Sequence, residues 1–270
     1  MFPGPHRRDM DTSSIPEAST FDRQTAKTTV TTFRIVEALK RQSGARVSDL
    51  ADELGLAKGT VHKHLSTLRK VNYVVQEDEQ YRLSLRFMGL GTTVRSNLEI
   101  YQVAYRSVEK LAEATGEVAS IMIPENGYGV YVLRVSAEGR PDIDIREGES
   151  VPLTATAGGK AILANMSSED HERIISRHGL PELTENTITD PEELRDELRR
   201  VRNRRRAIDR GEYHPDQRCV AASITDLDGN PLGAVIVSGP SDRMNEKLAD
   251  ADFASLVGST ADSIQSRLYR

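Results

Sequence analysis

The 270-residue sequence contains no tryptophan, one cysteine and few aromatic side chains of any kind. The single cysteine, Cys219, excludes a disulfide within the chain and is typical of a reducing compartment. No apolar run is long enough to cross a bilayer, and the first residues lack the apolar core of a signal peptide. We therefore expect a cytoplasmic protein without a membrane segment.

The sequence also lacks a general excess of positive charge, because its formal net charge is −5. This excludes a generally basic protein that coats nucleic acid. One stretch departs from the acidic average, since residues 58–76 contain neither Asp nor Glu but several cations and hydroxyls. A cationic, hydroxyl-rich helix suits a surface that meets phosphates and base edges. The alternative is a solvated helix face that happens to lack acids.

The surroundings of this stretch favour a DNA-binding motif. A short helix over residues 47–54, with Ser48 as its N-cap, ends at Gly55, and a second helix follows from Lys58 to Val71. Two short helices joined by a tight glycine turn form a helix-turn-helix, whose second helix enters the major groove. A third helix over residues 28–41 packs the other two. Two β-rich runs around an acidic tip at residues 77–79 then predict a hairpin, which completes a winged helix.

The second helix and the flanks of the motif supply the candidate DNA contacts. The residues expected to face DNA from the second helix are Lys58, Thr60, His62, Lys63, Ser66 and Arg69. The residues expected on phosphates are Lys27, Thr28, Arg34 and Arg82. The acidic wing tip is a poor phosphate binder, so we expect Arg82 and the recognition helix to contribute more than the tip.

The rest of the chain predicts an α+β domain, an antiparallel sheet with helices outside it. The expected organisation is a disordered tail (1–24), a winged helix-turn-helix (25–87), a linker helix (88–112) and a second domain (113–270). The apolar pattern over residues 85–113 predicts one long helix, interrupted near its start by Gly89 and Gly91. That helix either offers an apolar face to a second subunit or caps the core of the second domain. A short strand at 143–145 and a final helix over 245–268 are also expected.

Several motifs in the second half, in this order, resemble those of IclR-type transcriptional regulators. They are the segments 148–164, 209–212, 218–222 and 238–240. The resemblance implies a homodimer or homotetramer that binds a palindromic operator and senses a small organic acid through a GAF-like domain. The effector positions that it implies are Ala157, Gly158, Asp209, Cys219, Ile236 and Ser238. Ile236 is a departure, because some members have a polar residue there, and it favours a more apolar ligand or another pose.

The residues themselves agree with an acid-binding site. The segment 156–160 offers small side chains and free backbone N–H groups where a helix begins, which suits an anion. Ser238 can add a hydroxyl, while Met122 and Ile236 can form an apolar wall. The scarcity of aromatics favours a small aliphatic acid. The alternative is that the glycines serve only to reverse the chain.

Two other groups of residues give weaker functional hypotheses. Asp209, His214 and Cys219 match no common zinc signature, and Cys219 on a strand behaves as a small hydrophobe, so we expect no metal, no cofactor and no enzyme. The arginines of residues 195–206 follow acids at ion-pair spacing, which favours a solvated helix over a second DNA site. Two alternatives stay open for the second domain: it senses a partner or an oligomeric state, or it is an enzyme with a vestigial DNA-binding module.

Overall fold

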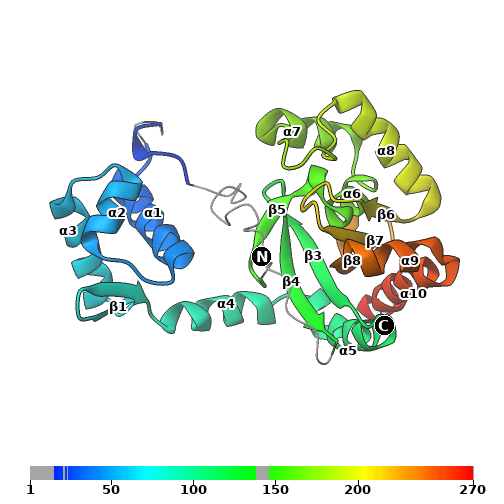
Figure 1. Cartoon of the computed structure of the whole chain (residues 1–270), viewed down its shortest axis with the longest axis horizontal. Coiled ribbons are helices and arrows are strands. Elements are labelled where there is room, and N and C mark those ends of the chain that lie inside the picture. Colours follow the sequence, from blue (N-terminus) through cyan, green and yellow to red (C-terminus); the bar gives the residue numbers. More distant parts are fainter. Residues whose placement is uncertain (1–14, 21, 23, 138–145, 270) are drawn as a thin grey trace. The chain divides into compact units, whose positions relative to one another are not determined.

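The computed structural model describes residues 15–269 except 21, 23 and 138–145 (Figure 1). The chain forms two compact units, and the boundary between them falls between Val94 and Arg95. Within the described residues, no helix is both long and apolar enough to cross a membrane.

The first unit is a three-helix bundle with a two-stranded hairpin. Its elements are a 3-10 turn (Ala18–Thr20), α1 (Lys27–Gln42), α2 (Val47–Leu54), α3 (Lys58–Lys70), β1 (Val74–Glu77) and β2 (Gln80–Leu83). The hairpin is antiparallel, and its tip lies between Glu77 and Gln80. Ile35, Leu50 and Leu65 are fully buried where the three helices meet, and Tyr81 of the hairpin packs on them. The expected winged helix-turn-helix is confirmed.

One local expectation in this unit was wrong. Helix α2 begins at Val47, so Ser48 lies in its first turn and Arg46 is the N-cap. The cap is completed by Asp49, whose Oδ2 accepts a hydrogen bond from the Arg46 backbone N–H at 3.2 Å. Within the tail that was expected to be disordered, Ala18–Thr20 forms a 3-10 turn. Residues 1–14 lie outside the described part.

The single helix expected over residues 85–113 is two helices, α4 (Arg86–Ser96) and α5 (Glu99–Thr115). The break falls at Asn97–Leu98, whereas Gly89 and Gly91 lie inside α4. Helix α5 buries Ile100, Val108 and Leu111 in the core of the second unit. Helix α4 buries no residue.

The second unit is built on a six-stranded antiparallel sheet with the order β5-β4-β3-β8-β7-β6. Its strands are β3 (Val118–Glu125), β4 (Tyr128–Ser136), β5 (Ser150–Pro152), β6 (Ala207–Asp209), β7 (Gln217–Thr225) and β8 (Pro231–Pro240). The strand expected at 143–145 lies outside the described residues. The mixed α+β class with an antiparallel sheet is confirmed.

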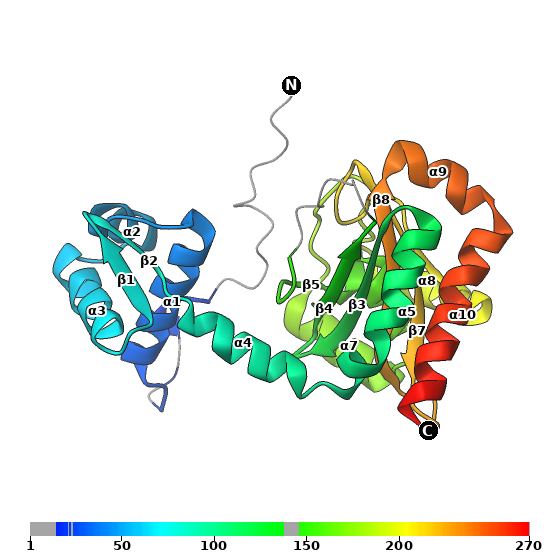
Figure 2. The same cartoon turned by 90° about the horizontal axis from the view of Figure 1, so that it is seen from below.

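Helices cover both faces of this sheet (Figures 1 and 2). One face carries α5, α9 (Ser241–Ala249) and α10 (Ala251–Leu268), with α5 and α10 side by side. The other carries a 3-10 turn (Leu153–Ala155), α6 (Ala157–Leu163), α7 (Ser168–His178) and α8 (Pro191–Arg204). The final helix expected over 245–268 is α9 followed by α10, because Asp250 ends the first and caps the second.

The alternation of side chains along β3 separates two cores. Ala119 and Ile121 point into the cluster under α5 and α10, while Met122 belongs to the cluster under α6 and α8. Ser120 shares the α6 side with Met122, because alternate residues of a strand face the same way. The α6 side of the sheet is the face on which most of the polar candidates gather.

Candidate DNA-binding surface and effector site

Helix α3 separates its apolar and polar residues as a recognition helix requires. Val61, Leu65 and Leu68 are buried against α1 and α2 at helical spacing. The exposed candidates on its other faces are Lys58, Thr60, His62, Lys63 and Arg69, and Ser66 is half-buried. The structure therefore presents this set of side chains on one helix, with its cations in solvent.

The candidate DNA contacts outside α3 differ in exposure and in the partners that they already have within the fold. Lys27 and Thr28 are exposed at the start of α1. The guanidinium of Arg34 donates to the backbone oxygen of Leu54 at 3.4 Å, so it also ties α1 to α2. Arg82 is paired with Glu77 across the hairpin, and its hydrogen bond and charge lower the pKa of that carboxyl. The Glu77 carboxylate therefore offsets the charge of Arg82.

His64 was not among the candidates, and the structure gives it a packing role. Its Nδ1 lies 2.8 Å from Oγ1 of Thr32, which connects α3 to α1. Partial burial, followed by the charge of Lys63, lowers the pKa of His64. The imidazole is therefore neutral near pH 7 and positions the recognition helix.

In the second unit, the strand register aligns the polar candidates across the α6 side of the sheet. Asp209 of β6 pairs with Cys219 of β7, which pairs with Ser238 of β8. The adjacent row contains Ile236 opposite Ser120. These side chains are far apart in the sequence, but they share one surface of the sheet: Ser120, Asp209, Cys219 and Ser238.

Helix α6 packs directly on this surface through its glycines. A Cβ added at Gly158 would lie 2.4 Å from Cδ1 of Ile236 and 3.0 Å from Sδ of Met122. Ala157 is buried beside it. All seven effector candidates therefore lie on or against the α6 side, and Ile236 and Met122 fill the space in front of Gly158.

The N-terminal turn of α6 already uses one of its N–H groups. Oγ1 of Thr156 accepts a hydrogen bond from the Gly159 N–H at 3.1 Å, as an N-cap does. Asp209 also has internal partners, because its Oδ1 accepts from the N–H groups of Gly211 at 2.9 Å and Glu212 at 2.7 Å. Burial raises the pKa of Asp209 in spite of these bonds. Asp209 thus organises the turn after β6.

Lys160 is the largest fully buried side chain among the described residues. Its ammonium donates to the Ile208 backbone oxygen at 2.8 Å and to Oε1 of Glu212 at 2.5 Å. Burial raises the pKa of Glu212 to about 7, against the opposing effect of the Lys160 charge. This pair fastens α6 to the edge strand β6 and its following turn.

Arg134 of β4 is a further candidate residue, which was not predicted from the sequence. Its Nη1 donates to Oγ of Ser120 at 3.4 Å, and its guanidinium carbon lies 5.2 Å from the ring centroid of Tyr131. Its Nη2 is buried and has no hydrogen-bond partner within the described residues. A lone arginine inside the apolar run of residues 130–135 was the available signal, since buried arginines need partners.

Burial keeps two titratable groups near Arg134, the Cys219 thiol and the Tyr131 phenol, in their neutral forms. Burial raises the pKa of the Cys219 thiol well above its ordinary value, and the charge of Arg134 opposes that shift only in part. Burial likewise raises the pKa of Tyr131. A neutral thiol, a neutral phenol and a cation with an unused N–H together suit an anion.

The two units match two family models. Residues 30–78 match the IclR helix-turn-helix domain, and residues 92–266 match the bacterial transcriptional regulator IclR C-terminal domain. A winged helix joined to this α+β domain defines a bacterial DNA-binding transcriptional regulator. The chain belongs to the IclR family.

Individual relatives are similar to this chain over most of its length. The HTH-type regulator RhmR of Escherichia coli (strain K12) is 28% identical over 217 residues, 80% of this chain and 84% of RhmR. A putative transcriptional regulator from Rhodococcus sp. RHA1 superposes with a TM-score of 0.76 at 27% identity, over 91% of this chain and 99% of that one. An IclR homolog from Microbacterium hydrocarbonoxydans, complexed with 4-hydroxybenzoate, has a TM-score of 0.70 at 21% identity, over 84% of this chain and 92% of that one.

Proposed function

We propose that this IclR-type regulator binds a specific operator through α3 and is controlled by a small organic acid held on the α6 side of the sheet. The observation that carries the proposal is the buried Nη2 of Arg134, which has no partner in the described residues and lies beside Ser120. DNA as the partner supports the cytoplasmic location expected from the sequence.

On the DNA side, α3 enters the major groove. Lys58, Lys63 and Arg69 supply charge, and the shorter polar side chains Thr60, His62 and Ser66 reach base edges or phosphates. Lys27 and Thr28 lie on phosphates. Arg34 and Arg82 add charge near the backbone, although each already has a partner within the fold.

We infer that the regulator acts as a homodimer or homotetramer on a palindromic operator. Leu85 and the α4 residues Met88, Leu90 and Val94 are exposed apolar side chains, with 81%, 70%, 51% and 66% of their surface accessible. Such clustering on a helix without buried residues supports its use against a second copy of the chain.

On the effector side, Arg134 holds the carboxylate of the ligand with its free N–H, and the Ser120 and Ser238 hydroxyls assist. The body of the ligand lies along Ile236 and Met122, between Ala157–Gly158 and the row Asp209–Cys219. A neutral Cys219 thiol does not repel the anion. The 4-hydroxybenzoate carried by the Microbacterium homolog supports an acid, and it puts aromatic acids beside aliphatic ones as candidates.

The test is a thermal-shift screen of the full chain against aliphatic acids and benzoates. A bound acid should raise Tm in a concentration-dependent way, by the equivalent of about 2.7 kcal/mol at a concentration of 100 Kd. Arg134→Met should weaken the response at least about tenfold, because a charged hydrogen bond and its charge are lost. Arg173→Met, at an exposed arginine paired with Asp170, is the matched control and should respond as the wild type does.

An unchanged response in Arg134→Met would contradict the assignment of that residue. If no acid in the panel raised Tm, the result would favour the alternative in which the second unit senses a partner or oligomeric state. One observation favours that alternative already: Ile236 and Met122 occupy the space in front of Gly158. The proposed ligand therefore requires the Ile236 side chain to turn aside.

A further inference from the structure

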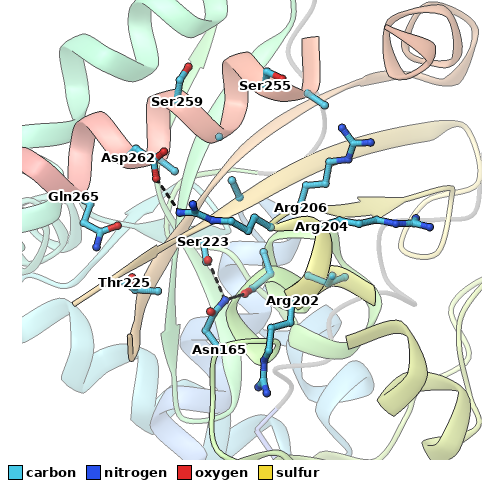
Figure 3. Close-up of a pocket in the computed structure, with 17 residues that line it drawn as sticks. Asn165, Arg202, Arg204, Arg206, Ser223, Thr225, Ser255, Ser259, Asp262 and Gln265 are labelled. Atoms are coloured by element: carbon cyan, nitrogen blue, oxygen red, sulfur yellow. Dashed lines mark hydrogen bonds and ion pairs between the residues drawn. The ribbon is translucent and has the colours of Figure 1, made fainter. Parts of the chain in front are cut away.

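We propose that a cationic cavity at the other end of α6 is a second ligand site, which binds the phosphate group of a small metabolite. The cavity has a volume of about 400 Å³ and lies among the ends of α6 and α8, strand β7 and helix α10 (Figure 3). This volume lies in the usual range of small-molecule sites, roughly 300–1,000 Å³. None of the seven effector candidates lines it.

The charge of the cavity comes from the end of α8. Arg202, Arg204, Arg205 and Arg206 line it, and Asp262 is the single acid among its lining residues. The chain reverses at Arg205, which adopts a left-handed φ of 54°, and the side chains of Arg202, Arg204 and Arg206 extend in different directions from this turn (Figure 3). The lining therefore carries a formal excess of three positive charges.

The arginines differ in what they already bind. Arg202 donates to the backbone oxygen of Ala164 at 2.6 Å, and Arg205 pairs with Asp262 at 3.2 Å. For Arg204 and Arg206, the described residues provide no ion-pair partner, and no dashed line reaches either guanidinium in Figure 3. Two cations therefore remain available to a ligand.

This end of α8 differs from the rest of the helix. Arg195, Arg199 and Arg200 pair with Glu192, Asp196 and Glu197 one turn earlier, as expected for a solvated helix. The last acid of the helix is Glu197, so the arginines after Arg200 have no acid one turn before them. The prediction of a solvated helix holds along α8, since Arg202 and Arg204 at its end are exposed, but the ion pairs within the helix stop at Arg200.

The walls of the cavity are polar and small. The Asn165 amide donates to Oγ of Ser223 at 2.9 Å, and Thr225 and Ser259 add hydroxyls. Ala254, Gly258 and Ala261 of α10 leave the hollow open, because an added Cβ at Gly258 would meet nothing within 4 Å. Hydroxyls and an amide suit the polar remainder of a phosphorylated metabolite better than an aromatic ring.

Phosphate is the anion that this arrangement favours. A planar guanidinium donates two parallel N–H groups to a phosphate, and two uncompensated arginines match its double charge. We therefore expect a compact, multiply charged anion.

The experiment measures binding of pyrophosphate and inorganic phosphate to the full chain by calorimetry, at an ionic strength held constant with sodium chloride. Arg204→Gln/Arg206→Gln should weaken pyrophosphate binding at least tenfold. The matched control Arg199→Gln/Arg200→Gln removes the same charge outside the cavity and should leave binding unchanged. Gly258→Leu fills the hollow without altering charge and should also abolish binding. Arg134→Met should retain the pyrophosphate response, which separates this site from the organic-acid site.

Three results would overturn the proposal. The first is no pyrophosphate binding by the wild type, and the second is equal weakening in both double variants. The third is a loss of DNA affinity in Arg204→Gln/Arg206→Gln without any pyrophosphate response, which would assign these arginines to DNA. The unfolding temperature of each variant, measured alongside, ensures that only folded proteins are compared.

Discussion

Replacing Lys160 by methionine should destabilise the second unit by about 3–5 kcal/mol, because the variant leaves Glu212 buried without its ammonium partner. The Ile208 backbone oxygen would lose its Lys160 donor as well. Methionine keeps most of the side-chain volume, so the loss reports the pair and not a cavity. Urea unfolding of the full chain, followed by far-UV circular dichroism, measures it.

The pH dependence of this loss has a definite sign. The raised pKa of Glu212 means that the folded state holds a proton more tightly than the unfolded state between about pH 4.5 and about 7. This group therefore makes stability fall as pH rises through that window. Without Lys160 the pKa of Glu212 should rise further, because the charge that opposes the shift is gone. The Lys160→Met substitution should therefore lower the free energy of unfolding by more at pH 8 than at pH 5.

Two variants control the measurement. Lys160→Met/Glu212→Gln removes the orphaned charge and should recover most of the lost stability. Lys110→Met, at an exposed lysine of α5, should change stability by less than about 0.5 kcal/mol. If Lys160→Met behaved as Lys110→Met does, the pair would not fasten α6 to β6.

Adding one methyl group at Gly159 should destabilise the second unit by about 3 kcal/mol or more, whereas the same change at Gly158 should cost about 1 kcal/mol. A Cβ at Gly159 would lie 2.0 Å from the Leu153 backbone oxygen, which cannot rotate away. At Gly158 the nearest atom is the end of the Ile236 side chain, which can turn to another rotamer. The two variants differ by one position on the same helix and are matched controls for each other.

Thermal unfolding of Gly159→Ala and Gly158→Ala, monitored by circular dichroism, tests this ranking. A Tm for Gly159→Ala equal to or above that of Gly158→Ala would contradict the close approach of α6 to the Leu153 backbone. The expected order would show that Gly159 serves packing. Gly158 then remains the glycine that faces the proposed effector.

The winged helix was predictable because its signals are local. Val61, Leu65 and Leu68 recur at helical spacing, Gly55 ends α2, and the cations of α3 stand in an acid-free stretch. The two-helix arrangement of residues 86–115 was not predictable in the same way. Apolar residues continue across Asn97–Leu98, and no proline or glycine stands at the break.

In the second unit, by contrast, most contacts of the candidate site could not be predicted from the sequence. The glycine segment was correctly placed at the start of a helix, but its close contacts come from Leu153 and from Ile236, far along the chain. Lys160 and Glu212 are 52 residues apart, and Arg134 meets Ser120 only through the β3–β4 pairing. Such partners are set by tertiary packing, which no local pattern in one sequence displays.

The most direct test of operator recognition by α3 is fluorescence anisotropy of the full chain on a duplex enriched from a random-sequence pool, across a range of salt concentrations. Affinity should fall steeply with salt, because phosphate contacts release counterions. Lys63→Ala should weaken binding about tenfold and lower the salt slope by about 1, whereas Lys40→Ala, at a lysine paired with Glu37, should do neither. Equal affinity and slope for Lys63→Ala and the wild type at low salt would contradict the placement of α3 on DNA.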